Sequence, residues 1–325
     1  MPPLLTVSDL TTTFPSDGRR VPVVDHVSFT IERGEVFALV GESGCGKSMS
    51  ALSLLRLVPK PGRIDAGSIV LEGRDVLALS VNEMRAVRGF DIAMIFQEPM
   101  TSLNPVVPCG AQVVEAIRLH EKVTKAAARE RTVALFKRVG IPDPEQRFDA
   151  YPHQLSGGLK QRVMIAMALS THPKLLIADE PTTALDVTIQ AQILELLRDL
   201  RRDLGMTIIL ITHDLGVVSE LADRVAVMYA GRIVETGRTR DVIDAPLHPY
   251  TRGLVRSIPA RAPRGVRLHE IAGVVPPPTE WPDGCRFANR CPAVLAYCAE
   301  RVPPVETRER DHQVWCHAVT AGLLP

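Results

Sequence analysis

The run GESGCGKS, residues 41–48, constrains the fold most, because it directly follows the apolar stretch EVFALV. It fits the pattern G-x-x-x-x-G-K-[S/T] of a phosphate loop. Glycines let such a loop curl until its N–H groups converge on phosphate oxygens, and the helix that follows adds the positive end of its dipole. The alternative is an ordinary glycine turn before a helix. The order of strand, loop and helix favours a nucleotide site over that turn.

The residues of this loop are candidate nucleotide contacts. We expect Lys47 to reach the β- and γ-phosphates and the Ser48 hydroxyl to bind Mg²⁺. Cys45 occupies a variable position of the motif, and we interpret it as a residue without a chemical role. The predicted contacts are Gly41, Glu42, Ser43, Gly44, Cys45, Gly46, Lys47, Ser48 and Met49.

A second motif, KLLIADEP, ends an apolar stretch in two acids, Asp179 and Glu180. Ligands of parallel sheets collect at the carboxyl ends of the strands. Asp179 therefore fits a Mg²⁺ ligand, and Glu180 is placed to polarise an attacking water. A strand that merely ends at polar residues is common, but the upstream glycine loop favours the functional interpretation.

Strand and helix patterns alternate along the chain and predict an α/β core with a parallel sheet. Residues 4–40 are rich in β-branched residues and predict strands, as do the runs LLIAD and TIILIT. A helix is predicted from about residue 46, and residues 110–140 are predicted to be helical with a break near Val123. Residues 189–204 carry one apolar face that ends at Gly205, which predicts an amphipathic helix.

Length and charge limit the class of protein. The chain has 325 residues and a formal net charge of +1, so we expect one large domain with an appendage and no nucleic-acid partner. Its apolar runs are too short to cross a bilayer, and the N-terminus lacks the pattern of a signal peptide. A chain that stays in the cytoplasm is expected to form no disulfides.

The run LSGGLKQR, residues 155–162, resembles the signature sequence of ABC (ATP-binding cassette) ATPases. Further motifs of that family occur along the chain in the expected order. Phe14 and Gln97, in IFQEP, precede this run, and TALD at residues 183–186 and His213, in ITHD, come after it. Taken alone, each of these residues would more often have a structural role than a functional one. Their order gives them weight, and the resemblance covers roughly residues 4–258.

This resemblance implies the fold and the domain organisation. We expect an ABC ATPase core of residues 1–258, with a RecA-like parallel sheet, an antiparallel β subdomain and a helical subdomain near residues 98–172. Residues 259–325 would form a small C-terminal module, because twelve of the 26 prolines and four of the six cysteines lie after residue 243.

The resemblance also implies roles for the motif residues. Phe14 would stack on adenine, Gln97 would join Ser48 and Asp179 at Mg²⁺, and His213 would contact the γ-phosphate. Two cassettes of the family pair head to tail, so the signature of one caps the γ-phosphate held by the other. The predicted signature contacts are Ser156, Gly157 and Gly158, and the predicted catalytic residues are Lys47, Gln97, Glu180 and His213.

Three further runs look like the ATPase subunits of oligopeptide and dipeptide importers: QEPMTSLNPV, APLHPYTRGLV and GCRFANRCPAVLAYC. This implies an ATPase that powers transport at the cytoplasmic face of the inner membrane. The implied partners are a second, related ATPase, two transmembrane permease subunits and an extracytoplasmic binding protein. Import of nickel or another solute is the alternative, and an ABC ATPase of DNA repair or translation is less favoured. The sequence identifies neither the solute nor whether the paired cassettes are identical.

The four late cysteines, Cys285, Cys291, Cys298 and Cys316, have the spacing C-x5-C-x6-C-x17-C. Clustered cysteines in a cytoplasmic chain suggest a metal more than disulfides. The spacing names no metal by itself, and the family resemblance favours a [4Fe–4S] cluster held by all four. Zinc is the alternative, with His312 or His317 in place of a cysteine, and four unliganded packed thiols are the third possibility.

Overall fold

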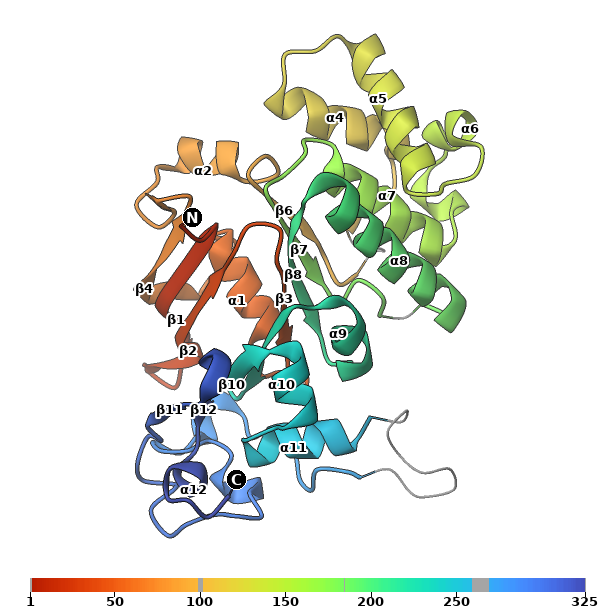
Figure 1. Cartoon of the computed structure of the whole chain (residues 1–325). Helices are drawn as coiled ribbons and strands as arrows, with labels where there is room; N and C mark the ends of the chain where they lie inside the picture. The colour runs from red at the N-terminus through yellow and green to blue at the C-terminus, as the bar shows by residue number, and fades with distance from the viewer. Residues whose placement is uncertain (1, 99–101, 184, 259–268, 325) are drawn as a thin grey trace. The chain divides into compact units, whose positions relative to one another are not determined.

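The computed structural model describes residues 2–98, 102–183, 185–258 and 269–324 (Figure 1). The chain divides into two compact units. Unit 1 comprises Met1–Ala78 and Leu210–Pro325, and unit 2 comprises Leu79–Ile209. The predicted boundary after residue 258 adjoins residues that lie outside the described ranges, so the division into residues 1–258 and 259–325 stays a prediction.

Unit 1 contains an antiparallel sheet in the order β2-β1-β4-β5. Its strands are β1 (Leu5–Ser16), β2 (Arg19–Ile31), β4 (Arg63–Leu71) and β5 (Arg74–Asp75). Asp17 and Gly18 turn the chain between β1 and β2, and both have positive φ, as a tight hairpin requires. This sheet agrees with the antiparallel subdomain that the family resemblance implied.

A second, mixed sheet lies in the same unit. Strand β3 (Val36–Val40) pairs in parallel with β9 (Arg224–Tyr229), which pairs antiparallel with β10 (Arg232–Arg238). All five residues of β3 are buried, as its continuous apolar run predicts. The C-terminal segment adds β12 (Gln313–Trp315) to β10, and β11 (Val305–Thr307) to β12, both antiparallel.

The helices of unit 1 are α1 (Lys47–Leu54), α9 (Leu215–Leu221), α10 (Thr239–Asp244), α11 (Pro249–Arg256) and α12 (His317–Thr320), with short 3₁₀ turns η3 (Pro278–Glu280), η4 (Ala288–Arg290) and η5 (Glu309–Asp311). Helices α9, α10 and α11 pack with strands β3, β9 and β10 in one core, and α12 packs with β12 in a smaller cluster. An aromatic group made of Tyr229, Tyr250 and Phe287 lies in this core, so residues of the C-terminal segment and of the cassette share it.

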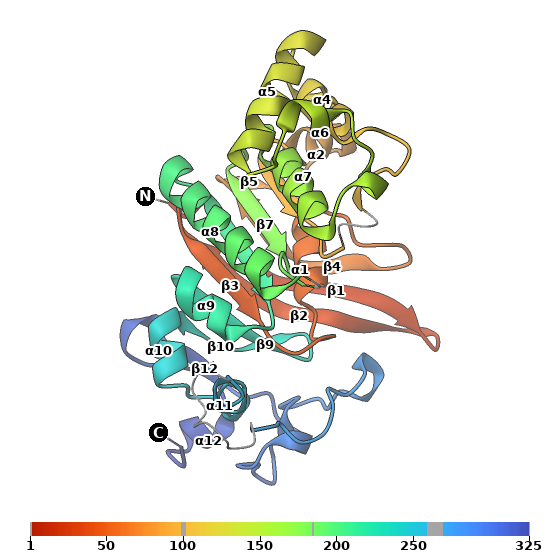
Figure 2. The same ribbon diagram turned by 90° about the vertical axis from the view of Figure 1, so that its right-hand side faces the viewer.

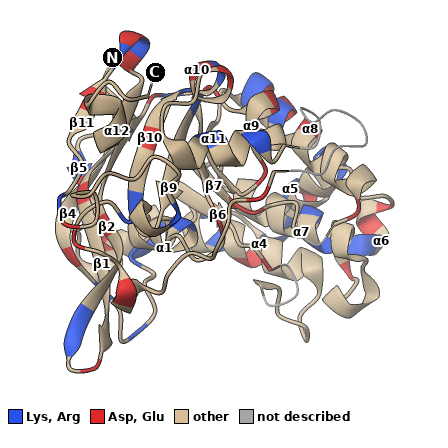
Figure 3. Ribbon diagram, turned by 90° about the horizontal axis from the view of Figure 1, so that it is seen from below, with Lys and Arg blue, Asp and Glu red and all other residues tan. Residues whose placement is uncertain are grey.

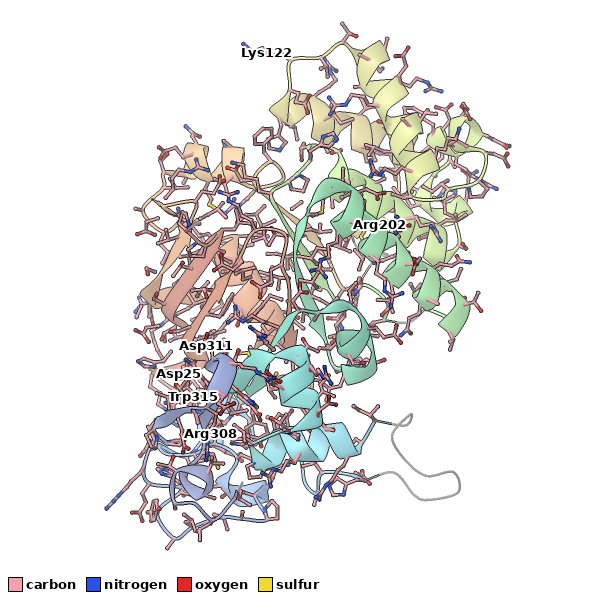
Figure 4. All side chains as sticks on the ribbon, viewed as in Figure 1. Asp25, Lys122, Arg202, Arg308, Asp311 and Trp315 are labelled. Atoms are coloured by element: carbon pink, nitrogen blue, oxygen red, sulfur yellow. The ribbon has the colours of Figure 1, made fainter. Side chains whose placement is uncertain are left out.

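Two arginines hold the C-terminal segment to strand β2 and its neighbours. The carboxylate of Asp25, labelled in Figure 4, accepts hydrogen bonds from Arg232 and from Arg286. Arg286 also donates to the carbonyl of Ala230, and its guanidinium lies 4.0 Å from the centre of the Trp281 ring. Burial alone would raise the pKa of Asp25, but the charges of Arg286 and Arg232 lower it.

Unit 2 combines two parallel strands with helices. Strand β6 (Ile92–Ile95) pairs with β7 (Leu175–Asp179), and α4, α5, α6 and α7 lie near one another in both Figure 1 and Figure 2. The helices are α2 (Val81–Val87), α4 (Cys109–His120), α5 (Lys125–Arg138), α6 (Pro144–Phe148), α7 (Gly157–Leu169) and α8 (Val187–Leu204), with the 3₁₀ turn η1 (Pro152–Gln154). Strand β8 (Thr207–Thr212) contains the boundary between the two units.

Several predicted elements are confirmed. The amphipathic helix over residues 189–204 is α8, which starts two residues earlier because the Asp186 side chain caps it by accepting from the N–H of Ile189. Gly205 ends it with φ 59°, a conformation that favours glycine. The predicted break near Val123 separates α4 from α5. The runs EVFALV, LLIAD and TIILIT form β3, β7 and β8.

Charges of both signs are interspersed, as the small net charge predicts. Figure 3 shows acidic and basic residues together on α6 and on α10, where Arg240 and Asp244 form an ion pair of 3.7 Å. Among the described residues, no helix is long and apolar enough to span a bilayer.

His248, from the run APLHPYTRGLV, caps helix α11. The ring nitrogen Nδ1 of His248 accepts from the backbone N–H of Tyr250 at 3.1 Å. The backbone N–H of His248 donates to the buried carboxylate of Glu235 at 2.9 Å. Complete burial, together with the charge of Arg252, lowers the pKa of His248 to about 4 against the opposing charge of Glu235. A protonated ring would also lose its role as acceptor. His248 is therefore neutral in the folded chain.

This burial predicts an acid-sensitive contribution to stability. Because the folded pKa lies below the unfolded value of 6.5, the unfolded chain takes up the proton first as the pH falls. The free energy of unfolding then decreases by about 1.4 kcal/mol per pH unit between these two values. We expect His248→Asn to remove this pH dependence when the free energy of unfolding is measured in urea at pH 7.5, 6 and 5. If the free energy falls equally with pH in the variant and the wild type, the assignment to His248 is wrong.

Candidate nucleotide site

Two glycines of the loop at residues 41–48 have no room for a side chain. Gly41 has φ 154°, and a Cβ there would lie 2.1 Å from the carbonyl oxygen of Met228. Gly46 has φ 103°, and its Cβ would lie 2.5 Å from the carbonyl oxygen of Val23. Gly44 also has positive φ, in open space. The loop can therefore curl and pack closely only because these positions are glycine.

Lys47 is the first residue of helix α1 and is buried. Its Nζ donates to the carbonyl oxygens of Gly41 at 2.8 Å and Glu42 at 3.1 Å. The ammonium group is thus held over the start of the loop by neutral acceptors. A triphosphate placed on the loop would offer it charged oxygens, which make stronger hydrogen bonds than carbonyls do.

The rest of the loop is anchored by its backbone. The carbonyl of Cys45 accepts from the N–H of Gly231 at 2.9 Å. The Cys45 thiol is fully buried, and burial raises its pKa, which agrees with its interpretation as a residue without a chemical role. Ser48 and Met49 are the second and third residues of α1, and Ser43 lies in the preceding turn.

Phe14 lies near the end of strand β1 and is partly buried. Its ring packs so closely on Gly62 that a Cβ on this glycine would lie 2.5 Å from a ring carbon. Gly62 thus leaves space for the ring. Stacking of Phe14 on adenine stays a prediction.

In unit 2, Asp179 ends the fully buried strand β7 and is itself 3% exposed. Glu180 follows with φ 46°, an uncommon conformation for a residue with a side chain. Its carboxylate accepts from the hydroxyl of Thr183 at 2.7 Å and from the amide of Gln97 at 3.3 Å. The structure thus brings two of the predicted catalytic residues, Gln97 and Glu180, together.

The predicted signature residues form a helix start in the same unit. Ser156 caps α7, where its hydroxyl accepts from the N–H of Leu159 at 3.4 Å. Gly158 faces Ile189 of helix α8 so closely that a Cβ would come within 2.9 Å of it. Free N–H groups of the first helical turn favour an anion. Of the run TALD, residue 184 lies outside the described residues, and Asp186 caps α8.

His213 is exposed after strand β8, next to Asp214, which caps α9. The predicted site residues are therefore divided between the units. Unit 1 carries Phe14, the loop at residues 41–48, Met49 and His213, whereas unit 2 carries Gln97, Ser156, Gly157, Gly158, Asp179 and Glu180. The predicted Mg²⁺ ligands are divided in the same way, with Ser48 in unit 1.

The predicted metal site at the late cysteines receives no support from the structure. All four residues are free thiols. Burial raises the pKa of Cys285 to about 12 and that of Cys291 to about 11. Within residues 2–98, 102–183, 185–258 and 269–324, no group of three or more His, Cys, Asp or Glu side chains is arranged to hold a metal ion.

The two histidines considered as alternative zinc ligands have other partners. Nε2 of His312 lies 2.7 Å from a carboxylate oxygen of Glu235, and Nε2 of His317 lies 2.8 Å from the carbonyl oxygen of Arg301. His312 thereby joins η5 to strand β10, and His317 joins α12 to the loop before β11. Both contacts are structural.

Sequence reasoning missed two residues at the loop. The hydroxyl of Tyr250 accepts from the N–H of Glu42 at 2.8 Å, and the guanidinium of Arg290 bonds to the Glu42 carboxylate. Both lie in runs that the sequence analysis singled out, APLHPYTRGLV and GCRFANRCPAVLAYC. Attention there fell on the cysteines, and nothing local in either run pointed to residue 42.

Comparison with known proteins covers nearly the whole chain. Residues 24–183 match the family described as ABC transporter, and residues 234–298 match the C-terminal region of oligopeptide/dipeptide transporters. The chain is 51% identical to the dipeptide transport ATP-binding protein DppD of Haemophilus influenzae, over 97% of this chain and 95% of that protein. It is also 51% identical to the oligopeptide transport ATP-binding protein AppD of Bacillus subtilis, over 97% of each.

Solved structures agree. A dimeric ATP-binding cassette, MJ0796, in a post-hydrolysis state with ADP and Pi is similar with a TM-score of 0.66 at 25% identity, over 73% of this chain and 99% of that one. The cassette cbiO1 from Clostridium perfringens is similar with a TM-score of 0.63 at 30% identity, over 75% of this chain and 92% of that one. The chain therefore belongs to the ATP-binding proteins of oligopeptide/dipeptide-type ABC transporters, a family of ATPases with the cassette fold.

Proposed function

We propose that this chain binds and hydrolyses ATP to power the import of dipeptides or oligopeptides across the cytoplasmic membrane. The observation that carries the proposal is the match along almost the full length to peptide-transport ATP-binding proteins, which includes the C-terminal segment and not the cassette alone. The glycine loop around Lys47 and the paired Gln97 and Glu180 supply the chemistry that such an ATPase needs.

Hydrolysis follows the logic of phosphoryl transfer. Loop N–H groups and Lys47 stabilise negative charge on the phosphates, while Glu180 orients or activates the attacking water. Gln97 would position Glu180 and join Ser48 and Asp179 around Mg²⁺, which neutralises charge on the β- and γ-phosphates when bound. His213 would contact the γ-phosphate, Phe14 would stack on adenine, and Ser156, Gly157 and Gly158 of a facing cassette would close the site.

We further propose an assembly at the cytoplasmic face of the inner membrane, to which the chain binds peripherally. It would contain a second, related ATPase subunit, two transmembrane permease subunits and an extracytoplasmic binding protein. The supporting observations are the family to which the chain belongs and the absence, among the described residues, of any helix that could span the bilayer.

An open groove in unit 2 supports a docking position for a permease subunit. It holds about 590 Å³ and lies between α4, α5 and α6, with Pro108, Leu119 and Phe148 among its lining residues. Leu119 is 74% exposed there, and the Arg129 guanidinium stacks 3.8 Å over the Phe148 ring. Because charged and apolar side chains share this lining, we propose that a short amphipathic segment of a permease binds it. The run QEPMTSLNPV, residues 97–106, comes just before α4 in the chain, and residues 99–101 of it are outside the described residues.

The cysteines enter the proposal only as a possible second cofactor site. The backbone N–H of Cys285 donates to the carbonyl of Cys298 at 2.6 Å, so these two cysteines lie side by side. We propose a [4Fe–4S] cluster on this basis, and no step of ATP hydrolysis depends on it.

Glu180→Gln tests the catalytic assignment. The variant should still bind ATP, whereas phosphate release should fall by about 100-fold or more, because the amide cannot act as a base. Lys47→Ala should lose nucleotide binding, measured with a fluorescent ATP analogue. Glu195→Gln, on the exposed face of α8, is the matched control and should resemble the wild type. Near-normal turnover in Glu180→Gln would overturn the role of this residue.

Leu119→Glu tests the docking groove. A carboxylate at this position should weaken co-purification with the permease subunits by roughly tenfold, since the apolar contact is replaced by a charge that must lose its water. ATP binding by the isolated chain should not change. Leu323→Glu is the control, because Leu323 is 63% exposed and lies far along the chain from the groove. Equal loss of permeases in both variants would contradict a specific role for the groove.

Anaerobic purification tests the cluster. We expect a brown protein with broad visible absorbance and about four iron and four sulfide ions per chain, and Cys291→Ser should lose this absorbance. A colourless protein without iron would refute the cluster, and stoichiometric zinc would replace it with the alternative metal.

A further inference from the structure

Arg290 reaches the phosphate loop from the C-terminal segment. Its Nη1 donates to Oε2 of Glu42 at 2.7 Å, and its Nη2 donates to Oε1 at 3.0 Å, which makes a bidentate ion pair. The side chain of Arg290 is 5% exposed and that of Glu42 is 31% exposed. Exposed ion pairs contribute little, but a bidentate pair with a buried guanidinium is both stronger and geometrically specific.

The guanidinium of Arg290 is held in place on every side. Its Nε donates to the carbonyl of Ala272 at 2.9 Å, and its Nη2 donates also to the carbonyls of Gly273 at 3.1 Å and Ile271 at 3.2 Å. Nη1 lies 3.4 Å from the Tyr229 hydroxyl. These neutral acceptors fix the direction of the side chain without using its charge. The positive charge of Arg290 therefore remains available to the carboxylate of Glu42.

Glu42 places a carboxylate in the phosphate loop. It is the second residue of a loop whose chemistry is to attract a triphosphate, and a carboxylate there repels phosphate oxygens. The same residue offers its carbonyl oxygen to the Nζ of Lys47 at 3.1 Å. Without a compensating charge, the Glu42 carboxylate would therefore weaken binding of a triphosphate at the loop. The backbone N–H of Glu42 is held separately by Tyr250.

We propose that Arg290 is a positioning residue of the nucleotide site: it neutralises the Glu42 carboxylate and thereby removes the repulsion that this carboxylate would exert on phosphates bound at the loop. This inference rests on the proposed nucleotide contacts of the loop. It gives the C-terminal segment a direct effect on ATP affinity. Every contact that carries it lies within unit 1.

The test is a charge-rescue experiment on the full-length chain. We expect Arg290→Ala to weaken binding of the fluorescent ATP analogue and to raise KM for ATP by roughly tenfold, which corresponds to about 1.4 kcal/mol. The double variant Arg290→Ala/Glu42→Gln should regain affinity to within about twofold of Glu42→Gln alone, because no uncompensated carboxylate remains. Arg290→Lys should lie between the wild type and Arg290→Ala, since a lysine keeps the charge but loses the bidentate geometry.

The controls separate this role from simple anchoring. Arg310→Ala removes another arginine–carboxylate contact of the C-terminal segment, to Asp241 at 3.4 Å, and should leave KM unchanged. If Arg290 only anchored the segment, Arg290→Ala would lower the melting temperature without a change in KM, or Glu42→Gln would fail to rescue it. Either result overturns the inference. If Arg290→Ala does not fold, the ATP affinity of Glu42→Gln is compared with that of the double variant Glu42→Gln/Arg290→Lys. The two affinities should be similar, because neither variant carries the Glu42 charge. A tenfold difference would refute a role of Arg290 that acts through this charge.

Lys47→Ala measured in parallel keeps the two proposals apart. If this variant still binds the nucleotide with normal affinity, the proposed loop contacts are wrong, and the role of Arg290 falls with them. If Lys47→Ala loses binding while Arg290→Ala keeps it, only the role of Arg290 is wrong.

Discussion

The close contact between the phosphate loop and its neighbouring backbone is the constraint on which unit 1 depends. Gly41 lies against the carbonyl of Met228 and Gly46 against that of Val23, with no space for a Cβ at either. The loop is therefore pinned between the end of strand β9 and strand β2, and Gly44 in its middle faces open space. Lys47 completes this arrangement by bonding back to the start of the loop. The packing of the loop thus requires glycine at both positions.

The C-terminal segment belongs to this arrangement. Phe287 packs edge-on against Tyr229 with the ring centres 5.1 Å apart, and Tyr229 packs in the same way against Tyr250. Arg286 and Arg290 extend from either side of Phe287 to two acids of the cassette. Burial and the nearby Arg232 lower the pKa of Arg286 to about 10, which still leaves it charged at neutral pH. The segment between Cys285 and Cys291 is thus a point of attachment, whatever the cysteines bind.

The sequence predicted those features that depend on local pattern. Apolar runs of strand length gave β3, β7 and β8, and the period of the apolar face gave α8 with its end at Gly205. Glycines at fixed spacing gave the loop, the acids at the end of an apolar run gave Asp179 and Glu180, and the family resemblance gave Gln97. The hydrogen bond that joins Gln97 to Glu180 spans 83 positions and was not predicted. Such patterns record the requirements of the backbone and of buried faces, which are local.

Contacts between distant residues were not predictable in this way. The pairing of Arg290 with Glu42 spans 248 positions, and the addition of β12 to the edge of β10 depends on how the whole C-terminal segment folds. Neither of these contacts leaves a periodic pattern or a fixed spacing in the local sequence. The cysteine prediction shows the opposite problem, because four clustered cysteines suggested a metal site and the described side chains form no group that could hold a metal ion. Residue types at a given spacing indicate candidate site residues. Only the packing of the folded chain decides which of these side chains come into contact.

The most direct test of the account is a structure of the Glu180→Gln protein assembled with its partners in Mg²⁺ and ATP. The account predicts that the β- and γ-phosphates lie on the N–H groups of the loop at residues 41–48, with Lys47 moved from its carbonyl partners to the phosphates and the Ser156 helix start of a facing cassette opposite. A triphosphate bound away from this loop, or held by one cassette alone, would contradict it.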